Sequence, residues 1–142
     1  MHLEITPRER EGIVILDFKG RITAGEEATA FRSAIEGYTG PGGDAKTGPK
    51  LILNLQHVDY IDSTGLGALV LGFTSLRKRD GRLILENLSR RNIELLLFTK
   101  LTTVFEIFND EQDAVNSCFP DREIRRFDIL DFVKGQTSQE GM

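Results

Sequence analysis

Residues 62–67 combine a carboxylate with two neighbouring hydroxyls and two glycines. They read Asp62-Ser63-Thr64-Gly65-Leu66-Gly67. A serine in such a place can accept a phosphoryl group from a kinase, which adds a charge of about −1.5 to −2 at pH 7. Glycine inside a helix costs up to about 1 kcal/mol relative to alanine, and Gly65 and Gly67 lie at the start of one predicted helix, with Gly72 further along. Their presence favours a surface that another protein approaches closely, or a serine that a kinase must reach.

The same six residues also have a purely structural explanation. Asp62 or Ser63 can be the N-cap of the helix, because a short polar side chain there accepts hydrogen bonds from free backbone amides. Gly65 and Gly67 can serve only to make a tight turn into the helix. The spacing alone leaves both interpretations open.

A second glycine-rich segment partly matches the pattern of a phosphate-binding loop. It reads Gly40-Pro41-Gly42-Gly43-Asp44-Ala45-Lys46-Thr47. It departs from the pattern G-x-x-x-x-G-K-[ST] because Ala45 replaces the second glycine. A true loop of this kind leads from a strand into a helix whose amides hold the phosphate, whereas here a predicted helix precedes and a predicted strand follows. We therefore interpret residues 40–49 as a flexible connector, with a nucleotide-binding or hydrolytic enzyme that uses Lys46 as the rival hypothesis.

Other nucleophiles and metal ligands are sparse. Ser63 lies outside a G-x-S-x-G motif, and the nearby His57 has no marked third member of a triad. The other histidine, His2, is far from His57 in the sequence, so no metal-ligand cluster is indicated. The single cysteine, Cys118, excludes an intramolecular disulfide and is interpreted as a partly buried apolar side chain. We expect no catalytic residues, no cofactor and no metal.

Strands and helices alternate along the chain, which predicts an α/β fold. Apolar and β-branched runs predict a hairpin of strands at 3–6 and 12–20 and further strands at 51–55, 82–86 and 104–108. Helical periodicity predicts helices at 24–38, 66–79, 91–100 and 110–118. Thr23 and Glu26 fit a capping box before the first helix, and residues 56–61 are predicted as a loop. We expect a mixed sheet of about five strands with about four helices that mainly cover one face.

Length and charge narrow the class of protein. The 142 residues predict a single domain at 1–118, then an extension at 119–134 that packs on the domain or reaches a second subunit, and a disordered tail at 135–142. The net charge is −4, and the basic residues are scattered among the acids, so no nucleic-acid partner is indicated. The apolar runs are too short to span a bilayer, and no signal peptide is visible. A cytoplasmic protein without membrane insertion is therefore expected.

The stretch from Leu51 to Gly67 resembles the signature of STAS domains, the sulfate-transporter and anti-sigma-factor-antagonist family. It reads LILNLQHVDYIDSTGLG and is similar in particular to bacterial anti-sigma-factor antagonists. The similarity in the order of elements extends from about Leu3 to Cys118. In that family a serine kinase that is also the anti-sigma factor phosphorylates the serine after the aspartate. The resemblance therefore implies that Ser63 is the phosphoacceptor, with Thr64 as the alternative.

The resemblance also implies a partner switch. The unphosphorylated antagonist binds the kinase, and the sigma factor is released. The phosphorylated antagonist dissociates from the kinase, and a PP2C-type phosphatase removes the phosphate again. The kinase-facing surface is expected to include Asp62, Ser63, Thr64, Gly65, Leu66 and Gly67.

The chain departs from the family pattern at the end of its second predicted strand. Many antagonists carry an acidic residue there, in a Gly-x-Leu-Asp pattern, where this chain has Gly20-Arg21-Ile22-Thr23. We include Arg21 and Thr23 in the expected partner surface, and the choice of kinase stays open. The rival within the same fold is a constitutive scaffold of a signalling or lipid-transport assembly, in which the serine need not be modified. A homodimer is a further open alternative.

Overall fold

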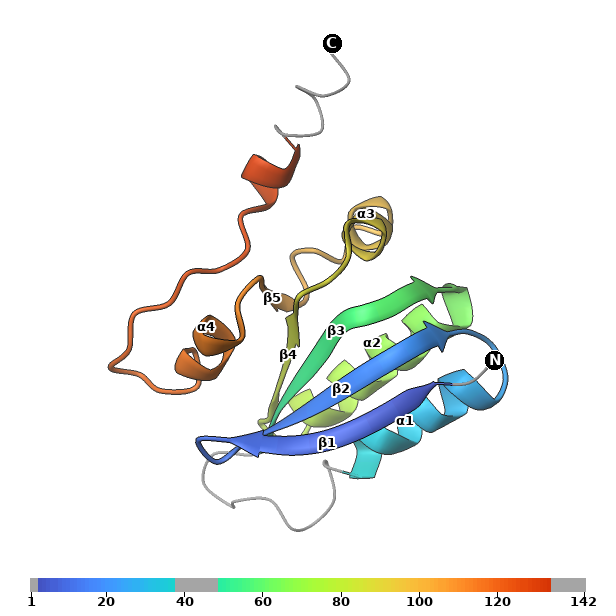
Figure 1. Cartoon of the computed structure of the whole chain (residues 1–142), viewed down its shortest axis with the longest axis horizontal. Coiled ribbons are helices and arrows are strands. Elements are labelled where there is room, and N and C mark those ends of the chain that lie inside the picture. The colour runs from blue at the N-terminus through green and yellow to red at the C-terminus, as the bar shows by residue number, and fades with distance from the viewer. Residues whose placement is uncertain (1–2, 38–48, 134–142) are drawn as a thin grey trace.

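Five strands form one mixed sheet in the computed structural model, which describes residues 3–37 and 49–133 (Figure 1). The strands follow one another across the sheet in sequence order: β1 (Glu4–Arg10), β2 (Ile13–Ile22), β3 (Lys50–Ile61), β4 (Arg82–Glu86) and β5 (Glu106–Phe108). β1 pairs antiparallel with β2, and the other neighbours pair in parallel. The predicted mixed α/β sheet is confirmed.

Helices cover the two faces of the sheet unequally. In the described part of the chain they are α1 (Glu26–Gly37), α2 (Ser63–Arg77), α3 (Arg90–Phe98) and α4 (Glu111–Asn116), and a further helical turn begins at Ile129. α1 and α2 lie side by side on one face, whereas α4 lies on the other (Figure 1). This agrees with the expectation that the helices mainly cover one face.

Two apolar clusters explain this arrangement, since successive side chains of a strand point to opposite faces. Leu51 and Leu53 of β3 enter the larger cluster, together with buried residues of α1, α2 and α3. Ile52 enters the smaller cluster beneath α4. The buried members of this smaller cluster are Ile13, Ile15, Ile52, Ile84, Phe108, Ala114, Val115 and Cys118. Cys118 is a free cysteine, and burial raises the pKa of its thiol, so it behaves as a small apolar side chain.

β3 is longer than the sequence indicates, and the predicted loop over 56–61 is wrong. Pairing with β2 continues to Ile61, but two register shifts interrupt it. Each shift disturbs the two-residue alternation of a strand, so Gln56 and His57 are exposed in succession, as are Asp59 and Tyr60. This spacing of exposed residues does not match the alternation expected of a strand, so the sequence does not reveal that β3 remains paired up to the start of α2.

The other differences concern the ends of elements. α1 begins at Glu26, two residues later than predicted, after Gly25 with a φ of 103°. The backbone carbonyl of Thr23 accepts the Ala28 amide at 3.0 Å. β5 and α4 are shorter than predicted, because strand pairing covers only the last three residues of the predicted strand at 104–108, and the helix covers only 111–116 of the predicted 110–118.

Residues 119–133 run past the free edge of the sheet. The Phe127 amide donates to the Ile107 carbonyl of β5 at 3.0 Å, and Phe127, Ile129 and Phe132 contact the larger cluster. The division into a domain and an extension stays a prediction. The remaining stretches, 40–48 of the expected connector and the expected tail at 135–142, lie outside the described residues.

Candidate functional site

Ser63 is the first residue of α2 and stands two residues after the end of β3. Its side chain is exposed, and within residues 3–37 and 49–133 its hydroxyl has no hydrogen-bond partner. The first backbone amides of a helix have no partner inside the helix and carry partial positive charge. The Ser63 hydroxyl is therefore accessible to a modifying enzyme, in a place where an added phosphate is favoured by the helix.

Asp62 is the N-cap of α2, which settles the choice between Asp62 and Ser63. Its Oδ1 accepts the Gly65 amide at 2.8 Å, and its Oδ2 accepts the Ala24 amide at 2.9 Å. Its own amide donates to the Ile22 carbonyl at 3.2 Å. The bonds from Gly65 and Ala24 lower the pKa of the carboxyl, so Asp62 is ionised at neutral pH. One side chain thus joins the start of α2 to the loop between β2 and α1.

Replacing this side chain should loosen both segments that it joins. In Asp62→Ala we expect the amides of Ala24 and Gly65 to exchange with solvent faster than in the wild type, because both lose their acceptor. Hydrogen exchange followed by NMR measures this directly. Asp59→Ala removes an exposed aspartate of β3 and serves as the matched control. Equal exchange at Ala24 and Gly65 in the two variants would contradict the bracing role of Asp62.

Gly65 and Leu66, two residues of the expected partner surface, are buried. A Cβ atom on Gly65 would lie 2.1 Å from the Ile22 carbonyl oxygen, so no side chain fits there. Gly67, by contrast, is exposed, and a Cβ atom there would have nothing within 4 Å. Gly65 therefore allows α2 to approach β2 closely, whereas Gly67 leaves bare surface next to the exposed Thr64.

An apolar groove between α1 and α2 adjoins this bare surface. Its volume is about 360 Å³. Its lining residues are Ala28, Thr29, Arg32, Thr64, Gly67, Ala68 and Leu71. The α1 residues of this groove and Leu71, which is 46% exposed, are not among the residues predicted from the sequence. The available signal was Leu71 itself, an apolar residue that lies off the buried stripe of its helix.

The other residues singled out in the sequence lie on β2, on β3, in the β2–α1 loop or outside the described residues. Arg21 is exposed on β2 and is paired in register with Tyr60 of β3. Thr23 is half-buried and precedes Ala24, the residue whose amide binds Asp62. His57 is exposed on β3, whereas His2 and Lys46 lie outside the described residues.

Among residues 3–37 and 49–133, no three His, Cys, Asp or Glu side chains are grouped so that they could hold a metal ion. None of the helices in this part of the chain has the length and apolar character needed to cross a membrane.

Comparison with known proteins gives the family. A family model of the STAS domain matches residues 4–114. An anti-sigma-B factor antagonist from Listeria monocytogenes is 38% identical over 109 residues, which is 77% of this chain and 90% of the relative. The chain belongs to the STAS domain family.

Solved structures share the fold. An anti-sigma factor antagonist from Mycobacterium paratuberculosis matches with a TM-score of 0.66 and 21% identity, over 81% of this chain and 92% of that one. The Bacillus cell fate determinant SpoIIAA in its phosphorylated form matches with a TM-score of 0.60 and 19% identity, over 81% and 99% of the two chains. These similarities confirm the fold expected from the resemblance.

Proposed function

We propose that this protein is an anti-sigma-factor antagonist whose partner is selected by phosphorylation of Ser63. With a free Ser63 hydroxyl it binds an anti-sigma factor that has serine-kinase activity, and the sigma factor is released for transcription. Phosphorylated at Ser63 it dissociates, and a PP2C-type phosphatase restores the first state. The protein acts in the cytoplasm by binding and not by catalysis.

The observation that carries the proposal is the exposed hydroxyl of Ser63 at the first position of α2, which has no hydrogen-bond partner among the residues that the structure describes. The chain also has a relative, 38% identical, that is named an anti-sigma-B factor antagonist. The surface offered to the partner consists of Ser63, Thr64 and Gly67 together with the groove between α1 and α2. Gly65 and Leu66 support this surface from inside, while Arg21 and Thr23 extend it beside the β2–α1 loop.

The electrostatics of the site explain how one phosphate changes the partner without unfolding the domain. A phosphate on Ser63 would face the free amides and the positive end of the α2 dipole, which tolerate negative charge. Asp62 is ionised beside it, so a docked interface would enclose two like-charged groups. Desolvation and repulsion of such groups cost several kcal/mol in an interface. The helix therefore accepts the phosphate, whereas the interface rejects it.

Phosphorylation by the cognate kinase tests the proposal. The purified chain is incubated with its anti-sigma factor kinase, Mg²⁺ and ATP, and the intact mass is measured. We expect one added phosphate in the wild type and in Thr64→Ala, and none in Ser63→Ala. A stable complex with the kinase but no added phosphate would contradict the switch and support a constitutive scaffold. Phosphate on Ser63→Ala but not on Thr64→Ala would move the phosphoacceptor to Thr64.

A further inference from the structure

Glu86, the last residue of β4, has a fully buried carboxyl group on the face of the sheet that α4 covers. Its Oε2 accepts a hydrogen bond from Asn87 Nδ2 at 3.1 Å. Its Oε1 has no hydrogen-bond partner among the described residues. A buried carboxylate oxygen without a partner is unfavourable, so the protonation state of this group matters for the stability of its surroundings.

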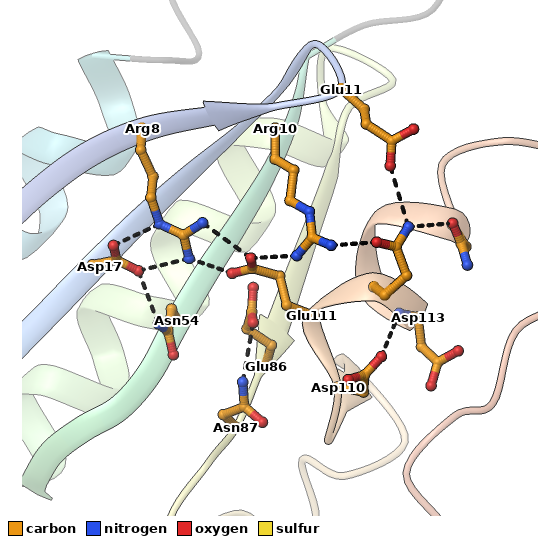
Figure 2. A network of polar contacts seen from close by, with 12 residues as sticks. Arg8, Arg10, Glu11, Asp17, Asn54, Glu86, Asn87, Asp110, Glu111 and Asp113 are labelled. Atoms are coloured by element: carbon orange, nitrogen blue, oxygen red, sulfur yellow. Dashed lines mark hydrogen bonds and ion pairs between the residues drawn. The ribbon is translucent and has the colours of Figure 1, made fainter.

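Glu111, the first residue of α4, brings a second carboxyl group next to that of Glu86 (Figure 2). The Glu111 carboxylate accepts hydrogen bonds from Arg8 Nη1 at 3.0 Å and from Arg10 Nη1 at 2.7 Å. Arg8 is shared, because its Nε also donates to Asp17 at 2.7 Å. The Glu111 side chain thus links α4 to β1 directly and lies against Glu86 of β4.

The charges of this cluster do not balance when every carboxyl is ionised. Glu86 is surrounded by polar and charged groups from several elements (Figure 2). They are Arg8 and Arg10 of β1, Asp17 of β2, Asn54 of β3, Asn87, and Glu111 of α4. The neighbouring residue on β5 is the apolar Phe108. The polar and charged groups contain two guanidinium groups against three carboxyls, counting Glu86. A proton on Glu86 makes the cluster neutral, and the resulting O–H can donate to Glu111. Protonation therefore removes the charge excess and gives Glu86 Oε1 a partner.

The ionisation of the two carboxyls agrees with this geometry. Burial, followed by the negative charge of Glu111, raises the pKa of Glu86 to about 8. The hydrogen bond from Arg8, with a further one from Arg10, lowers the pKa of Glu111 to about 2. One proton thus resides on Glu86, beside an ionised Glu111, at neutral pH.

We propose that Glu86 and Glu111 share one proton that fastens α4 to the sheet, and that loss of this proton at mildly alkaline pH weakens the docking of α4. When α4 opens, Glu86 becomes solvated and regains the ordinary pKa of a glutamate, near 4.3. Between that value and about 8 the closed form holds one more proton than the open form. Opening therefore becomes about tenfold more favourable for each pH unit in this range and levels off above it. The docking of α4 is therefore strongest near the ordinary pKa of a glutamate and weakens toward alkali, while below that pH the lowered pKa of Glu111 favours opening again.

Hydrogen exchange of the full chain tests this device. After correction for the pH dependence of intrinsic exchange, we expect the protection of the α4 amides in the wild type to fall about tenfold from pH 6 to pH 7 and about fivefold from pH 7 to pH 8. In Glu86→Gln, whose neutral amide can also donate to Glu111, the protection should stay constant over the same range. The amides of α2 provide an internal control and should not follow this dependence. Parallel profiles for α4 in the wild type and in Glu86→Gln would overturn the proposal.

A direct titration decides the question even where Glu86→Gln fails to fold. Side-chain carboxyl signals of the wild type, followed by ¹³C NMR, should include one glutamate with a midpoint near pH 8. In Glu111→Gln the neighbouring negative charge is absent, so this midpoint should move down. If every carboxyl of the wild type titrates below about pH 6.5, well within the reach of ordinary carboxyl groups, the shared proton does not exist.

Discussion

Ser63→Asp is expected to fold like the wild type and to bind the cognate anti-sigma factor kinase about 100-fold more weakly. The new carboxylate lies at the positive end of α2, which accommodates it, but a docked partner would enclose it next to the ionised Asp62. Like charges in an interface cost several kcal/mol, and about 2.7 kcal/mol already corresponds to a 100-fold change in affinity. Ser63→Ala lacks both the charge and the phosphoacceptor, so it should bind whether or not ATP is present.

Calorimetric titration of each variant with the kinase measures these affinities. Thermal unfolding of the free variants checks that both fold normally. Thr103→Asp adds the same charge at an exposed position in the segment between α3 and β5, and it should bind like the wild type. The switch would be refuted by equal affinities of Ser63→Asp and Ser63→Ala.

Gly65→Ala should destabilise the domain by about 3 kcal/mol, which corresponds to a fall of roughly 10 °C in Tm. The added Cβ would meet the Ile22 carbonyl oxygen, a backbone atom that cannot move without disturbing β2. Gly67→Ala, two residues along the same helix, meets open space. Since alanine is the better helix former, this variant should be unchanged or more stable by up to about 1 kcal/mol.

Chemical denaturation of the two glycine variants gives the free energies of unfolding. Because both changes add one methyl group to the same helix, the difference between them isolates the contact with Ile22. A similar loss of stability in both variants would mean that helix propensity, and not this contact, limits what can replace Gly65.

The sequence was sufficient for the order of strands and helices and for the position of Ser63. The apolar run of β3 and the polar residues that follow it are adjacent in the chain, so local patterns report both. The resemblance carried by the stretch from Leu51 to Gly67 then identified the family. Local patterns could not reveal the full length of β3, because the register shifts with β2 that disturb its alternation depend on another strand.

Contacts between distant parts of the chain account for the other differences. Gly65 looks like a surface glycine until Ile22, more than 40 residues earlier, is placed against it. The groove beside Thr64 needs α1 as its second wall. The cluster around Glu86 joins Arg8 to Glu111, which are 103 positions apart. None of these contacts can be recognised from the spacing of residues that are adjacent in the sequence.

The brace formed by Asp62 bears on the rates of partner exchange. Since Asp62 holds the start of α2 and the β2–α1 loop together, the backbone around Ser63 is already ordered before a partner arrives. A preorganised surface loses little conformational entropy on contact. The association rate with the anti-sigma factor kinase should therefore differ little between the unphosphorylated and the phosphorylated protein. Phosphorylation should mainly shorten the lifetime of the complex, because affinity differences among variants of one interface arise mostly from dissociation. The rate at which the protein exchanges one partner for another would then be set by the dissociation rate of the complex.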